Sequence, residues 1–193
     1  MLRAELPEAP EPLDRWLIKD EVALLRQHVP LHVNRFITIS LFTGRRKKAI
    51  LDLRWKRSPH NGWIDLDNRK IYFKGYADSE TTKRRGTITM PDQLYEIAKD
   101  WKQDGNQSVI HYMGNPVKDV DTSFDRACKI CGFDDVVRHT LKHTAVTWAF
   151  QGGMTLEDAV DYFATSAETL MKVYRHHSTH YQGRATAVMD GIG

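Results

Sequence analysis

The chain has 193 residues, which predicts one domain, or one domain with a small appendage. Hydrophobic residues make up 41% of it and charged residues 27%, and no apolar run approaches the roughly 18 residues that would cross a bilayer. The net charge of +3 is too small to imply a nucleic-acid partner by itself. No signal-peptide pattern opens the chain, because Glu5, Glu8 and Glu11 alternate with prolines there, so we expect a cytoplasmic protein.

The first quarter of the chain predicts a loose leader followed by helices. Residues 1–13 are rich in proline and glutamate and are expected to form a flexible leader. A helix capped near Asp20 should follow, and the apolar stretch Val33–Leu41 predicts a second, buried helix. Gly44 interrupts this helix, and helical periodicity resumes over Arg46–Leu53.

The pattern then changes to short strands. The segments 62–66 and 70–74 are apolar and alternating, and Asp67-Asn68 between them predicts the turn of a hairpin. A third strand is expected over Thr87–Met90. The polar tip between the second and third strands carries Lys83, which we expect to project from the sheet.

The second half of the chain is predicted to be mainly helical. A helix is expected over Asp92–Trp101, followed by an extended piece at 109–112 and a turn at Gly114. From about Asp121 onward the helical pattern is interrupted at three places, which are Gly132, Gly152-Gly153 and residues 164–166. The fold class that follows is α+β, mainly α-helical, with a small three-stranded antiparallel sheet.

Two cysteines form a Cys-x-x-Cys pair that resembles half of a zinc site. Cys128 and Cys131 precede His139 and His143, but the spacing between the two pairs is too short for the usual zinc finger. Both cysteines also fit one apolar helix stripe together with Phe124. We therefore predict core cysteines, with no metal and no disulfide.

Basic residues gather in two clusters, one within 45–57 and one at 83–85. A solvated surface is the plain alternative for either cluster. Because the two clusters flank the candidate site residues described below, a phosphate-facing surface is favoured.

Four short boxes appear in a fixed order along the chain: Thr-Gly-Arg-Arg at 43–46, Leu-Asp-Leu-Arg-Trp at 51–55, His-Thr-Leu-Lys-His-Thr at 139–144 and Val-Tyr-Arg-His-His at 173–177. Their order and spacing resemble the catalytic domain of tyrosine recombinases, the phage-integrase family, and the ending resembles bacterial and prophage-type integrases. The resemblance implies a DNA breaking-rejoining fold over residues 14–193. It also implies that the N-terminal core-binding domain usual in the family is absent from this chain.

The resemblance implies a role for each matching residue. Tyr174 would attack the scissile phosphate and form a 3′-phosphotyrosyl link, with Tyr181 as a rival that lacks the spacing. Arg46, favoured over its neighbour Arg45 by the Thr-Gly-x-Arg count, would hold the phosphate with the paired donors of a guanidinium. His139 would bind phosphate or relay the tyrosine proton.

A lysine in the sheet would be the general acid that protonates the departing 5′ oxygen. Lys83 stands at the spacing from Pro91 that the resemblance predicts, and Lys74 is the second candidate. The expected partner is double-stranded DNA bound by a homotetramer, with no cofactor, metal or membrane involved.

Two positions depart from the family pattern. Lys142 stands where the family has its second arginine, and Thr165, nine residues before Tyr174, stands where it has His or Trp. By this resemblance, Thr165 would donate one weak hydrogen bond to the phosphate. A lysine keeps the charge without the planar fork, and losing one preorganised donor commonly removes roughly 3–4 kcal/mol of transition-state stabilisation. We therefore expect site-specific DNA integration or recombination with reduced cleavage. A catalytically impaired DNA-binding remnant and a type IB topoisomerase-like activity remain as alternatives.

Overall fold

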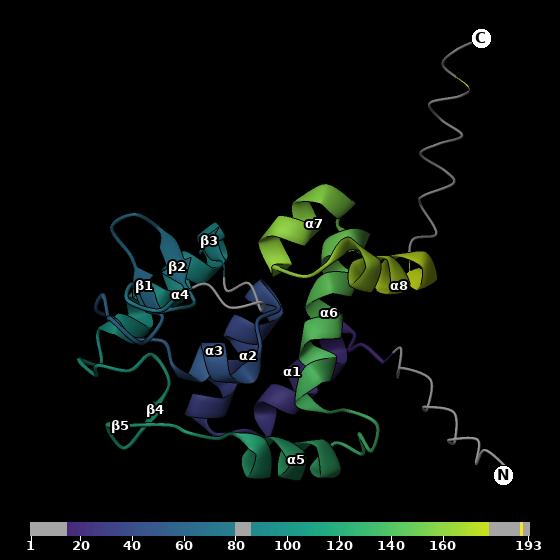
Figure 1. The fold of residues 1–193 in the computed structure, drawn as a ribbon. Helices are drawn as coiled ribbons and strands as arrows, with labels where there is room; N and C mark the ends of the chain where they lie inside the picture. Colours follow the sequence, from purple (N-terminus) through teal and green to yellow (C-terminus); the bar gives the residue numbers. More distant parts are fainter. Residues whose placement is uncertain (1–14, 80–85, 178–189, 191–193) are drawn as a thin grey trace, which may run out of the picture.

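A small antiparallel sheet lies at one side of a group of helices in the computed structural model, which describes residues 15–79, 86–177 and 190 (Figure 1). The predicted leader at 1–13 lies outside this range. In chain order the elements are α1 (Lys19–Gln27), α2 (Leu31–Thr43), α3 (Lys47–Leu51), β1 (Trp63–Asp65), β2 (Lys70–Tyr72), β3 (Thr87–Thr89), α4 (Asp92–Lys102), β4 (His111–Tyr112), β5 (Asn115–Pro116), α5 (Asp121–Ile130), α6 (Arg138–Gln151), α7 (Leu156–Phe163) and α8 (Ala167–His177). The described residues contain no helix that is long and apolar enough to cross a membrane.

Within the described residues the predicted helices are confirmed, with one boundary error; the helical pattern expected after residue 177 lies almost entirely outside them. The helix expected over 46–53 is shorter, because Arg46 is extended (φ −68°, ψ 149°) and α3 ends at Leu51. After Leu51 the backbone forms hydrogen bonds with distant segments instead of continuing the helix. The Val109 amide donates to the Leu53 carbonyl at 3.0 Å, and the Arg54 amide donates to the Gly62 carbonyl at 2.9 Å. These partners are distant in sequence, so helical periodicity alone could not place the end of the helix.

The predicted sheet is confirmed with strand order β1-β2-β3, all antiparallel. Ile64, Ile71 and Ile88 are in register across the three strands and are buried on the inner face. On the outer face Trp63 pairs with Tyr72, and their rings stack at 4.2 Å. Alternation of side chains along each strand thus places the isoleucines on the core face of the sheet and the stacked rings of Trp63 and Tyr72 on the opposite face.

A second, two-stranded sheet was not predicted. Strands β4 and β5 pair through Tyr112 and Asn115, and the connection is Met113-Gly114, both with positive φ (49° and 79°). Two positive φ values are characteristic of a type I′ turn, which normally prefers Asn-Gly. A methionine at the first turn position hides this hairpin from sequence patterns.

Two groups of buried side chains form the core, and α6 contributes to both. The larger group contains buried side chains from helices α1 through α5, from the three-stranded sheet and from Leu141 in α6. Cys128 belongs to this group, so the predicted core cysteine is confirmed. The smaller group packs the second half of α6 against α7 and α8; its buried members are Ala145, Val146, Phe150, Ala159, Phe163 and Leu170. Helix α6 therefore connects the sheet-containing half to the C-terminal helices.

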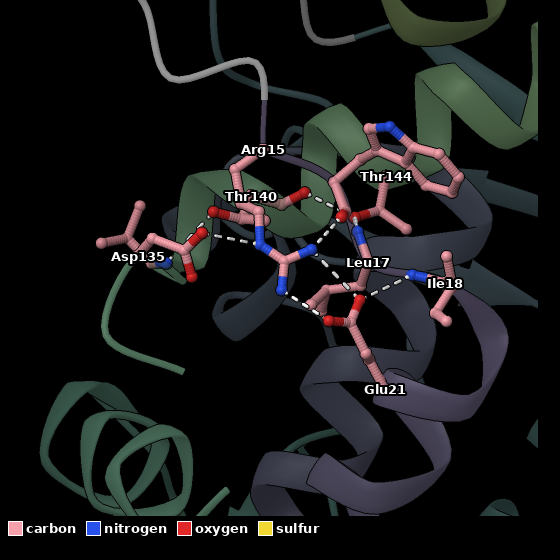
Figure 2. Close-up of polar contacts among 9 residues, drawn as sticks. Arg15, Leu17, Ile18, Glu21, Asp135, Thr140 and Thr144 are labelled. Atoms are coloured by element: carbon pink, nitrogen blue, oxygen red, sulfur yellow. Dashed lines mark hydrogen bonds and ion pairs between the residues drawn. The ribbon is translucent and has the colours of Figure 1, made fainter. Parts of the chain in front are cut away.

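The segment before α1 is fixed against α6 by polar contacts (Figure 2). Arg15 forms ion pairs with Glu21 at 2.6 Å and with Asp135 at 2.9 Å. The Leu17 amide donates to the buried Thr144 hydroxyl at 2.9 Å, and that hydroxyl donates to the Thr140 carbonyl at 2.8 Å. Thr144, the last residue of the 139–144 box, thus has a structural role.

Replacing Gly44 with alanine should lower the free energy of unfolding by about 3 kcal/mol, because strain and a clash add. Gly44 has φ +58°, and a Cβ there would lie 2.5 Å from Cδ1 of Phe163. Gly105 is a matched control, since its φ is +73° and a Cβ would meet nothing within 4 Å. Gly105→Ala should therefore destabilise by only about 1 kcal/mol in urea denaturation. Equal effects of the two substitutions would show that the Phe163 contact is unimportant.

Candidate active site

The turn between α2 and α3 separates two neighbouring arginines. Arg45 points into the protein and is 7% exposed; its guanidinium donates to the Tyr162 carbonyl at 2.9 Å and lies 4.8 Å from the Phe73 ring centroid. Burial lowers the pKa of Arg45 to about 10, so it stays charged at neutral pH. Arg46 is exposed and lines an open cavity. The geometry therefore makes Arg46 the arginine that a ligand could reach.

Helix α6 brings two more of the predicted site residues to the same cavity. His139 and Lys142 lie three residues apart, on one face of the helix, and line a volume of about 320 Å³ together with Arg46. His143 packs its ring against His139 with centroids 4.7 Å apart. Residues almost a hundred positions apart in sequence thus meet at one hollow.

The cavity is positively charged. Burial first, and then the charges of Arg46 and Arg45, lower the pKa of Lys142 to about 8. Desolvation, followed by His143, Lys142 and Arg46, also lowers the pKa of His139. Like charges held this close favour binding of an anion, which would relieve their repulsion.

Most other cations near the cavity are already neutralised. Lys47 binds Asp121 at 2.7 Å and Asp119 at 3.1 Å. Arg138 pairs with Asp121 at 2.8 Å and also with Asp125. Among the described residues no carboxylate pairs with Arg46 or Lys142, so these two cations remain for a ligand.

Thr165 forms a hydrogen bond with Lys142, which lines the cavity. Its hydroxyl accepts a hydrogen bond from the Lys142 ammonium at 2.8 Å and donates to the Phe163 carbonyl at 3.1 Å. The sequence suggested that Thr165 would donate to a phosphate. Its single proton is instead directed at Phe163 in this structure, which does not support that role.

The structure leaves two predicted residues undefined. Lys83 lies in the 80–85 segment, outside the described residues. Tyr174 lies in α8, but the description of that helix does not extend to its side chain. Lys74, the alternative to Lys83, lines a different hollow of about 820 Å³ on the outer face of the sheet, beside Trp63 and Tyr72.

Contacts that sequence reasoning missed join the end of α7 to the α2–α3 turn. The Tyr162 hydroxyl donates to the Phe42 carbonyl at 2.8 Å, and the Phe163 ring occupies the space that a side chain at Gly44 would need. Thr165 lies beside Lys142, and Lys142 and Arg46 line the same cavity. Only Gly44 gave a sequence signal for the contacts with α7, as the glycine of the 43–46 box.

The fold is that of the tyrosine recombinase catalytic domain, and the resemblance noted in the sequence is confirmed. Two solved structures carry this fold at 16% identity: the Tn1549 transposon integrase in complex with a circular intermediate DNA (TM-score 0.73, covering 97% of this chain and 68% of that one) and the catalytic domain of bacteriophage HP1 integrase (TM-score 0.63, covering 90% and 94%).

A curated relative agrees with these structures. The integrase of Salmonella phage P22 is 22% identical over 209 residues, which cover 98% of this chain and 51% of that protein. The chain thus spans about half the length of this relative. No family model matches the chain.

Proposed function

We propose that this domain performs site-specific DNA recombination or integration, cleaving and rejoining double-stranded DNA through a 3′-phosphotyrosyl link at Tyr174. The observation that carries the proposal is the meeting of Arg46, His139 and Lys142 around one cationic cavity in a tyrosine recombinase fold. The integrase of Tn1549, which shares the fold, was solved on a circular intermediate DNA. Phosphate oxygens are the anion that such a partner would bring to the cavity.

The chemistry follows from the residue types. The Tyr174 oxygen attacks phosphorus, the bond to the 5′ oxygen breaks, and that oxygen takes a proton from Lys83. His139, whose lowered pKa favours the neutral imidazole at pH 7, accepts the tyrosine proton. Arg46 and Lys142 stabilise the charge on the pentacoordinate phosphorus. Attack by a 5′ hydroxyl on the phosphotyrosine reverses the step.

The packing of α8 is compatible with this nucleophile. Leu170 is buried in the smaller core group, against α6 and α7. The helix that contains position 174 therefore lies beside the helix that carries His139 and Lys142.

The partner and setting belong to the same proposal. The chain would bind duplex DNA weakly, since one domain makes few phosphate contacts, and with strong salt dependence, since contacts between cationic side chains and phosphates release counterions. Four protomers would assemble on two duplexes, in the cytoplasm.

A nicked suicide substrate, which traps the covalent intermediate, tests the proposal. Wild-type protein should leave a DNA adduct that is resistant to denaturation, and Tyr174→Phe should abolish it because the attacking oxygen is missing. Tyr181→Phe is the matched control and should leave the adduct yield unchanged.

An adduct that survives in Tyr174→Phe would refute this nucleophile. DNA binding without any wild-type adduct would instead indicate the DNA-binding remnant. Relaxation of a supercoiled plasmid that carries no partner site would indicate topoisomerase-like activity.

A further inference from the structure

The two departures from the family pattern contact each other. The Lys142 ammonium donates to the Thr165 hydroxyl at 2.8 Å, although the residues lie on different helical segments, α6 and the end of α7. Their positions in the sequence do not connect them, because they lie 23 residues apart. Their contact suggests that they act together.

The backbone holds the Thr165 hydroxyl in a defined place. Helix α7 ends at Phe163, and the next residue, Ala164, caps it in the left-handed conformation (φ 47°, ψ 49°). The Thr165 amide donates to the Val160 carbonyl at 3.3 Å. The hydroxyl proton is directed at the carbonyl of Phe163, whose ring is buried. The oxygen lone pairs are therefore presented toward Lys142 before any ligand binds.

Lysine and threonine complement each other chemically. A lysine ammonium is a point charge on a flexible four-carbon stem, so it needs an external acceptor to fix its direction, whereas the planar fork of arginine is preorganised. A hydroxyl can serve as that acceptor. A tryptophan N–H cannot accept, and a histidine accepts only through the unprotonated nitrogen of its neutral form, so the family residues at position 165 are poorer anchors for the ammonium of Lys142 than a hydroxyl.

We infer that Thr165 is a positioning residue that aims the Lys142 ammonium into the cavity, and that the pair acts as one unit in place of the arginine and the histidine or tryptophan of the family. The inference rests on the proposed cleavage reaction. Under it, Thr165 does not touch the phosphate, and its effect on catalysis passes entirely through Lys142.

A mutant cycle on the suicide substrate tests this coupling. Thr165→Val, which keeps the shape and removes the acceptor, should slow adduct formation about 10-fold, while Thr165→Ser should stay within about 3-fold. In a Lys142→Arg background, Thr165→Val should change the rate less than about 3-fold, because the guanidinium needs no anchor. An equal loss in both backgrounds would overturn the inference.

A second readout does not depend on cleavage. Competitive acetylation of the free protein with acetic anhydride, followed across pH by peptide mass spectrometry, reports the pKa of Lys142, with exposed Lys129 as the internal reference. Thr165→Val should lower the pKa of Lys142 by about one unit, because the acceptor favours the charged form, and Thr165→Ser should not.

The outcomes separate the two proposals. A shifted pKa of Lys142 with no adduct from the wild-type protein would reject the proposed cleavage and retain the pair as a structural fact. An adduct together with an unshifted pKa and additive rates would reject the pair and retain the cleavage.

Discussion

Replacing Arg46 with alanine should slow formation of the covalent DNA adduct by about 10²–10³-fold, the usual effect of removing a preorganised donor from a developing anion. Arg46 is exposed, lines the cavity beside His139 and Lys142, and pairs with no carboxylate in the described part of the chain. In the described part of the chain its side chain makes no hydrogen bond or ion pair, and its charge opposes that of Lys142, so the variant should not unfold at a lower temperature than the wild-type protein. Quenched single-turnover reactions with the nicked substrate measure the effect.

The control for Arg46 lies two residues further along the chain, in α3. Lys48 is also exposed, and its one ion pair within the described residues is with Asp52, at 3.0 Å. Lys48→Ala removes one positive charge from the same surface, so it should weaken DNA binding slightly and leave the cleavage rate within about 3-fold. Similar losses in Arg46→Ala and Lys48→Ala would mean that net charge, not a defined phosphate contact, controls the rate.

Replacing Lys142 with methionine should abolish adduct formation and yet stabilise the folded domain. The ammonium is half-buried near Arg46 and Arg45, and its pKa falls from 10.5 to about 8. The folded state therefore disfavours the charged form, and methionine removes this penalty with a chain of similar shape. After allowance for solvent screening, we expect a gain of about 1–2 kcal/mol in the free energy of unfolding at pH 7.

The stabilisation by Lys142→Met should depend on pH. The folded pKa of Lys142 lies below the unfolded value, so the unfolded state binds more protons between pH 8 and 10.5. The destabilisation by Lys142 is complete below about pH 8 and disappears as the pH rises toward 10.5. The advantage of Lys142→Met should therefore shrink over that window. For the wild-type protein, the adduct rate at low DNA concentration should fall above about pH 8, where the ammonium loses its proton.

Urea denaturation across pH measures the stability change. Lys129→Met is the matched control, because Lys129 is an exposed helical lysine with no ion pair in the described structure, and its effect should be within about 0.5 kcal/mol at every pH. A destabilised Lys142→Met protein would show that the ammonium is solvated in the folded state and is not held against the two arginines.

Local patterns predicted most elements correctly, and the errors have a common origin. The helix over 46–53 ended early at Leu51 because Leu53 pairs with Val109. The hairpin at β4 and β5 was missed because Met113 occupies a turn position that usually carries asparagine. In both cases the deciding interaction or conformation does not appear in the periodicity of nearby residues.

The candidate site shows the same division. Box spacing pointed to Arg46 and not to Arg45, and the structure gives the reason, since Arg45 is bound to the Tyr162 carbonyl. Spacing also suggested one large basic cluster at 45–57. The structure pairs Lys47 with Asp121, 74 residues away, and buries Arg45.

By itself the sequence determined the order of helices and strands, the apolar faces that form the core, and the residues that resemble a recombinase site, since these depend on side chains a few positions apart. Only the tertiary structure decided which cations remain available and how Lys142 and Thr165 relate. Ion pairing and desolvation depend on distance in space, and α6, α7 and the α2–α3 turn meet only when the chain is packed. The Lys142–Thr165 contact at 2.8 Å changes two separate departures from a pattern into one testable unit.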